Sequence, residues 1–69
     1  MTPKEQRDYE LGRIRSSIEH YKGQIPRCCE LIRLFPEDSE MHAFELRNCI
    51  FMLRRHIREY KELINKPLR

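Results

Sequence analysis

The sequence contains no valine and no tryptophan, and it has only one threonine and two glycines among its 69 residues. Valine and threonine favour strands, whereas the abundant lysine, arginine and glutamate favour helices. No serine- or glycine-rich tract is present, so the composition differs from that of a disordered chain. A chain of this length forms one domain at most. We therefore expect an all-α fold in a single domain over residues 1–69.

Long apolar runs are also missing. No run approaches the roughly 20 residues that a membrane-spanning helix needs. The first ten residues, MTPKEQRDYE, lack the apolar core of a secretory signal. The cysteines number three, and an odd count in a small chain without such a signal indicates reduced thiols inside a cell. These observations predict a soluble cytoplasmic protein without a membrane partner.

The sequence shows no pattern that specifies catalysis. It has no Ser-His-Asp set, no glycine-rich phosphate loop and no recognisable pair of catalytic carboxylates. Cys28 and Cys29 are adjacent and do not have the spacing of zinc ligands, with or without Cys49, His42 and His56. A thin helical structure also offers little concave volume for a substrate. We expect no enzyme, no metal, no cofactor and no small-molecule substrate, while a disulfide from Cys49 to Cys28 or Cys29 under oxidation stays open.

Two segments carry apolar residues at alternating steps of three and four, which is the heptad pattern of packed helices. The first segment, about 3–35, opens with a capping box formed by Thr2 and Glu5 around Pro3. Residues 36–38 form the turn, and the second segment runs from about 38 to 65. The first apolar seam consists of Leu11, Ile14, Ile18, Tyr21, Ile25, Cys28, Ile32 and Phe35. The second consists of Ala43, Leu46, Ile50, Leu53, Ile57, Tyr60 and Ile64.

Folding the second seam back onto the first gives seven residue pairs without a slip in register. Phe35 then meets Ala43 at the turn, and Ile14 meets Ile64 at the open end. The pattern predicts an antiparallel helical hairpin with arms of about 45 Å, at 1.5 Å per residue. Gly23 and Pro26 interrupt the first arm, where a proline removes a backbone hydrogen bond and disfavours the helical conformation of the preceding residue. The sequence is compatible with either a kink or a true break in the first arm at this point.

A lone two-helix hairpin buries one narrow seam and is marginally stable. We expect two hairpins to pair into a four-helix bundle, which would make the protein a homodimer. The alternative is a monomeric three-helix bundle in which the chain breaks near Gly23–Pro26 and the segment Pro26–Phe35 folds over as a separate helix.

The positions on the two sides of the seam differ in charge. One side is a row of basic residues interrupted by Cys29, and like charges at this spacing repel within a hairpin. It contains Arg15, Lys22, Arg47, Arg54 and Lys61. The other side is mostly neutral or apolar and is the predicted face for self-association or a protein partner. It contains Glu10, Ser17, Gln24, Leu31, Cys49, His56 and Leu63, widened by Leu34 and Met52 near the turn.

These surfaces predict a small intracellular interaction protein: an adaptor, inhibitor or regulatory subunit that binds another protein, in a homodimer or a hetero-complex, through helix faces. The contact residues expected for a protein partner are Leu31, Phe44, Arg47, Phe51, Met52, Arg54 and Arg58. The alternative is a nucleic-acid-binding regulator whose cations contact phosphates. Its expected contacts are Arg15, Lys22, Arg47, Arg54, Arg58 and Lys61. A plainly solvated face, with pairs such as Arg55–Glu59 and Arg58–Glu62, would also explain these charges.

Overall fold

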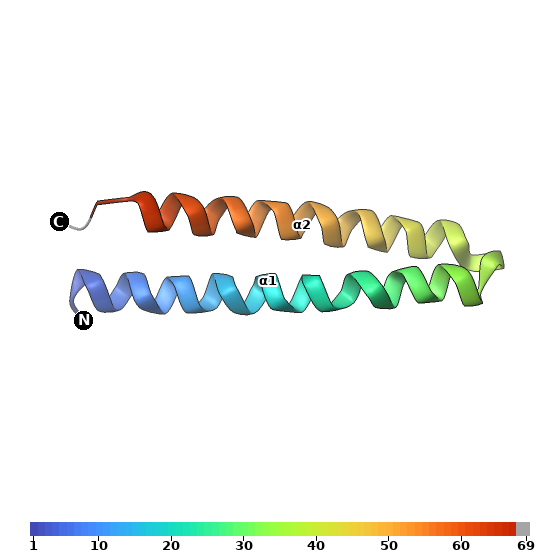
Figure 1. Cartoon of the computed structure of the whole chain (residues 1–69), viewed down its shortest axis with the longest axis horizontal. Coiled ribbons are helices and arrows are strands. Elements are labelled where there is room, and N and C mark those ends of the chain that lie inside the picture. The colour runs from blue at the N-terminus through green and yellow to red at the C-terminus, as the bar shows by residue number, and fades with distance from the viewer. Residues whose placement is uncertain (68–69) are drawn as a thin grey trace.

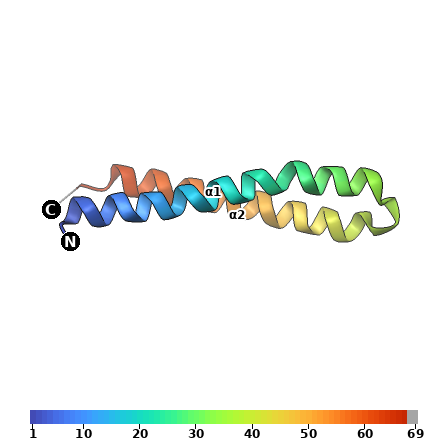
Figure 2. The same cartoon turned by 90° about the horizontal axis from the view of Figure 1, so that it is seen from below.

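The computed structural model describes residues 1–67 and consists there of two long antiparallel helices joined by a tight turn (Figure 1). Helix α1 spans Pro3–Leu34, the 3₁₀ turn η1 spans Pro36–Asp38, and helix α2 spans Ser39–Asn65. The molecule measures 53 × 15 × 12 Å. Seen at right angles, the helices cross near the middle of the hairpin, as packed helices do when they coil around each other (Figure 2). The predicted all-α hairpin is confirmed.

Helix α1 begins where the capping residues predict. The Glu5 backbone N–H donates to the Thr2 hydroxyl at 3.2 Å, and Pro3 is the first helical residue. Proline suits this position because its missing N–H would have no partner in the first turn. The cap therefore fixes the start of the helix.

Pro26 lies inside α1 without ending it. The helix continues from Pro3 to Leu34, so the break required for a three-helix bundle is absent, and that alternative is wrong for this chain. Both Pro26 and Gly23 are exposed. The carbonyl that loses its amide partner belongs to Lys22, which is also exposed, so water can satisfy it. The half-buried or buried residues on both sides, Ile25 and Cys28, keep α1 against α2 through this point.

The turn is set by Pro36. Phe35 adopts φ −127° and ψ 72°, because a following proline excludes the helical conformation. Its N–H still donates to the Leu31 carbonyl at 2.9 Å, and its own carbonyl accepts from the Asp38 N–H at 3.0 Å. The carboxylates of Glu37, Asp38 and Glu40 then lie near the start of α2, where the helix dipole favours negative charge.

The packed surface is rotated relative to the predicted seam. The buried residues are Cys28, Cys49 and His42, which are 4%, 9% and 9% exposed. Cys49 belongs to the side predicted to face a partner, and Leu31 and Leu63 from that side are half-buried as well. Most of the face predicted for self-association is therefore partly covered by the hairpin itself, while Leu34 of that face is exposed. Small and neutral side chains there tolerate close helix approach, whereas the charged residues on the other side remain in water.

Two ring contacts fix the register. Tyr21 of α1 stacks on His56 of α2, with ring centroids 5.7 Å apart and planes 20° apart. The seam alone pairs Tyr21 with Ile57, the next residue along the chain, so the predicted register lies within one residue of the observed one. Nearer the open end, the Arg15 guanidinium donates to the Tyr60 hydroxyl at 2.8 Å and lies 5.8 Å from the ring centroid.

Replacing Pro26 with alanine tests whether α1 is continuous in solution. We expect Pro26→Ala to raise the free energy of unfolding by roughly 2–3 kcal/mol, since it restores an N–H donor within a helix that is already formed. The matched control is Gly12→Ala, because a Cβ at Gly12 meets nothing within 4 Å, and we expect about 1 kcal/mol there. Urea unfolding followed by circular dichroism measures both. An effect of Pro26→Ala no larger than that of the control would show that the helix is broken at this position.

Candidate interaction surface

The outward side of α2 exposes two phenylalanines. Phe44 is 71% exposed and Phe51 is 64% exposed, more than any other large apolar residue in 1–67 except Met1. They are seven residues apart, so they lie on the same side of the helix and about 10 Å from each other. The buried side of α2 carries His42 and Cys49, which places the two rings away from α1. Exposed aromatic groups of this size make this side of α2 the candidate interaction surface.

Exposed cations follow the same side of α2 toward the open end. Arg47, Arg54, Arg58 and Lys61 are all exposed. Among residues 1–67 the ion pair between an arginine and a carboxylate is Arg55–Glu59, at 3.2 Å, so the predicted Arg58–Glu62 pair is not formed. The arginines beside the two rings are therefore available to an anionic partner.

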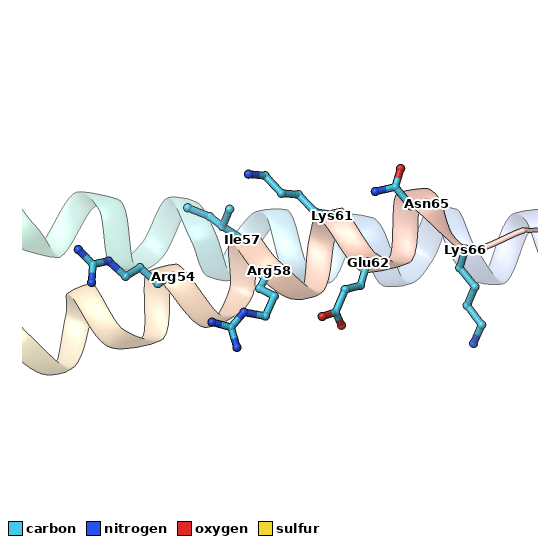
Figure 3. A pocket seen from close by; sticks show the side chains of 7 residues that line it. All are labelled: Arg54, Ile57, Arg58, Lys61, Glu62, Asn65 and Lys66. Carbon is cyan, nitrogen blue, oxygen red and sulfur yellow. The ribbon is translucent and has the colours of Figure 1, made fainter.

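Arg54, Arg58 and Lys61, together with Lys66, border a shallow hollow on α2 (Figure 3). Its lining residues are Arg54, Ile57, Arg58, Lys61, Glu62, Asn65 and Lys66. Six of them project from α2 and Lys66 follows its last residue; Figure 3 shows Lys61 and Asn65 pointing to one side while Arg58, Glu62 and Lys66 point to the other. Because the hollow is shallow, open to solvent and lined by one helical segment, it cannot enclose a small ligand and suits the surface of a macromolecule better.

The basic residues of α1 lie in a different setting. Lys22 is exposed, whereas Arg15 is held at the edge of the helix contact by Tyr60. The hydrogen bond that Arg15 donates to the Tyr60 hydroxyl, followed by the charge interaction with Tyr60, raises the pKa of Arg15 above its ordinary value. The continuous part of the predicted basic surface is therefore the α2 part, and Arg15 also joins the two helices.

The remaining residues predicted to contact a protein divide between surface and packing. Leu31 and Met52 are half-buried, so they contribute to the hairpin itself. Near the turn, Leu34, Phe35 and Met41 are exposed and extend the apolar surface beyond Phe44. The sequence alone does not decide whether these side chains pack against the neighbouring helix. Their exposure shows that they do so only in part.

The cysteines and histidines form part of the interior. Cys28 and Cys49 are buried free thiols, and Cys29 is an exposed one. Burial raises the pKa of the Cys28 thiol, and the nearby Cys49 thiol raises it further. His42 and His56 each have Nδ1 near the glutamate three residues later, at 4.0 and 3.4 Å, but without hydrogen-bond geometry. Within the described part of the chain, no group of three or more potential ligands gathers to hold a metal.

Neither α1 nor α2, over the residues that the structure describes, has a stretch long and apolar enough to cross a bilayer. Comparison of the chain with protein-family models, with curated proteins and with solved structures finds no match. The exposed side of α2 therefore has to be interpreted from its own residues.

The two neighbouring cysteines should differ in reactivity. A thiolate is the reactive form of cysteine, and both burial and the raised pKa of Cys28 reduce its population at neutral pH. We expect iodoacetamide to modify Cys29 at least about tenfold faster than Cys28 at pH 8. Mass spectrometry of the digested protein reads out each site, and the chain unfolded in urea serves as the control in which the rates converge. Equal rates in the folded chain would contradict the buried position of Cys28.

Proposed function

We propose that this chain is a protein–protein interaction module that binds another polypeptide along the outward side of α2. The observation that carries the proposal is the exposure of Phe44 and Phe51 beside Arg47 and Arg54. Aromatic residues and arginine are the side chains that most often dominate binding energy at protein interfaces. A partner with apolar residues flanked by carboxylates complements this surface.

The form of the surface favours a helical partner. Phe44, Arg47, Phe51 and Arg54 recur at steps of three and four, so they make a straight row along α2. A partner helix lying along that row contacts all four with its own residues at the same spacing. Such binding requires no chemistry from this chain, in keeping with a role as an adaptor, inhibitor or regulatory subunit. Its reduced thiols are compatible with action inside a cell.

The proposal can be tested by placing a photo-crosslinking amino acid, benzoylphenylalanine, at position 51. We expect protein adducts at this position and a loss of at least about tenfold in their yield when Arg47 and Arg54 are both replaced by glutamate, because the charge match is then reversed. The matched control is the same amino acid at position 9, since Tyr9 is an aromatic residue that is also exposed but lies on α1. Mass spectrometry identifies the adducts. Equal labelling from positions 51 and 9 would contradict the proposal.

A second candidate function is nucleic-acid binding, favoured by the four cations around the α2 hollow. This reading predicts an affinity for double-stranded DNA or RNA that falls steeply between about 50 and 200 mM salt, because phosphate contacts release counterions. Arg54→Glu should weaken it further, whereas Arg33→Glu on α1, an exposed arginine outside the surface, should have a smaller effect. Fluorescence anisotropy with labelled duplexes measures this. No binding at the lower salt concentration would exclude the second candidate.

A further inference from the structure

A second heptad seam runs along the outward side of α2. Its residues recur at steps of four and three, as in the packed seam, but all of them are exposed. We call this set the outer stripe; it consists of Glu40, Phe44, Arg47, Phe51, Arg54 and Arg58. A helix with heptad seams on two sides is equipped to pack against one helix on each side. Helix α1 occupies the first side, and no other element of the described chain occupies the second.

Charge is distributed along the outer stripe in a definite order. Glu40 lies at the turn end, Phe44 and Phe51 lie in the middle, and Arg54 and Arg58 lie toward the open end. A second copy placed parallel to the first would set like charges against like. Placed antiparallel, it sets the acidic end of each stripe against the basic end of the other. The stripe is therefore complementary to itself in the antiparallel direction only.

One register satisfies every position of the stripe. Two α2 helices can lie antiparallel with their outer stripes in contact, so that the level of Cys49 along each helix marks the centre of the contact. In this register Glu40 faces Arg58 of the second copy, and Phe44 faces its Arg54. Arg47 then faces Phe51, and the symmetry repeats each of these pairs once. Arginine over a phenylalanine face is a favourable cation–π arrangement. Beyond the stripe, the same register places Glu37 of the turn opposite Lys61.

Neighbouring registers are worse. A shift by one heptad in one direction puts Arg47 opposite Arg58, and a shift in the other puts Glu40 opposite Phe51. The first places like charges together, and the second leaves a carboxylate against a ring face whose charge is also negative. The sequence of the stripe therefore selects a single alignment, as the charged flanks of coiled coils do.

We propose that two copies of this chain associate through their outer stripes, antiparallel and centred on Cys49, into a four-helix assembly with the two α2 helices at its centre. This proposal rests on the proposed function, since it names the polypeptide that occupies the same surface. It also accounts for the exposure of Phe44 and Phe51, which a second copy would cover. Two phenylalanines and the stems of three arginines from each copy would make the apolar part of a small interface. We therefore expect a dissociation constant on the order of micromolar.

A charge swap tests the register. Each of E40R and R58E should raise the dimer dissociation constant at least tenfold, because the reversed position now faces a like charge twice per dimer. An equimolar mixture of E40R chains with R58E chains should dimerise again, because both contacts then join opposite charges. The double variant E40R/R58E should dimerise by itself for the same reason. The control is E19R, which changes an exposed glutamate on α1, outside the stripe, and should leave the constant unchanged.

Sedimentation equilibrium under reducing conditions measures all of these chains, and circular dichroism establishes that each variant is folded. A wild-type chain that stays monomeric up to about 100 μM would overturn the proposal, since that is a hundredfold above a micromolar constant. A dimer that neither single variant weakens, or that the mixture and the double variant fail to restore, would overturn it as well.

The oligomeric state and the crosslinking from position 51 together separate self-association from binding of a different polypeptide. A monomeric chain that still forms protein adducts from position 51, now with a different polypeptide, would remove self-association and keep the proposed function. A dimer with the expected charge-swap behaviour whose adducts at position 51 join two copies of this chain supports both. Equal labelling from positions 51 and 9 would contradict the proposed function. A wild-type dimer whose dissociation constant does not change in the charge-swap variants would show that self-association uses another face.

Discussion

The structure depends on a single line of contact between two helices. A hairpin has no third element to cover it, so each helix can bury only the side that faces the other. The consequence is an interior of three buried residues, Cys28, His42 and Cys49, bordered by half-buried ones. Small thiols and a histidine occupy positions that a larger protein would fill with leucine or phenylalanine. Half-buried isoleucines and leucines along the same line complete the contact between the helices.

This constraint explains where the larger apolar groups lie. Phe44 and Phe51 are exposed and project from the side of α2 opposite to the buried Cys49. The same is true of the arginines, whose charge requires water or a paired carboxylate. The outward side of α2 therefore carries large apolar and charged side chains that the packing of the hairpin does not use.

The sequence predicted the hairpin correctly because its evidence is local and periodic. Thr2, Pro3 and Pro36 mark the helix ends by backbone chemistry that does not depend on tertiary contacts. The rotation of the packed seam could not be predicted in this way, because the heptad pattern defines a broad apolar side and not the angle at which it meets its neighbour. The continuity of α1 through Pro26 likewise depends on contacts with α2 on both sides of the proline. The exposure of Phe44 followed from its place off the seam, whereas the half-burial of Leu31 depends on the rotation.

The slenderness of the hairpin has an electrostatic consequence. Its short dimensions are 15 and 12 Å, while the Debye length is about 8 Å at physiological ionic strength. Charges on one face are therefore largely screened from a molecule that approaches the other, and the formal net charge of +3 describes neither face. At about 0.01 M salt the Debye length grows to about 30 Å, and the whole chain then attracts any polyanion as one cation. At higher ionic strength only nearby charges act on an approaching molecule, so the order of acidic, aromatic and basic residues along α2 then matters more than the net charge.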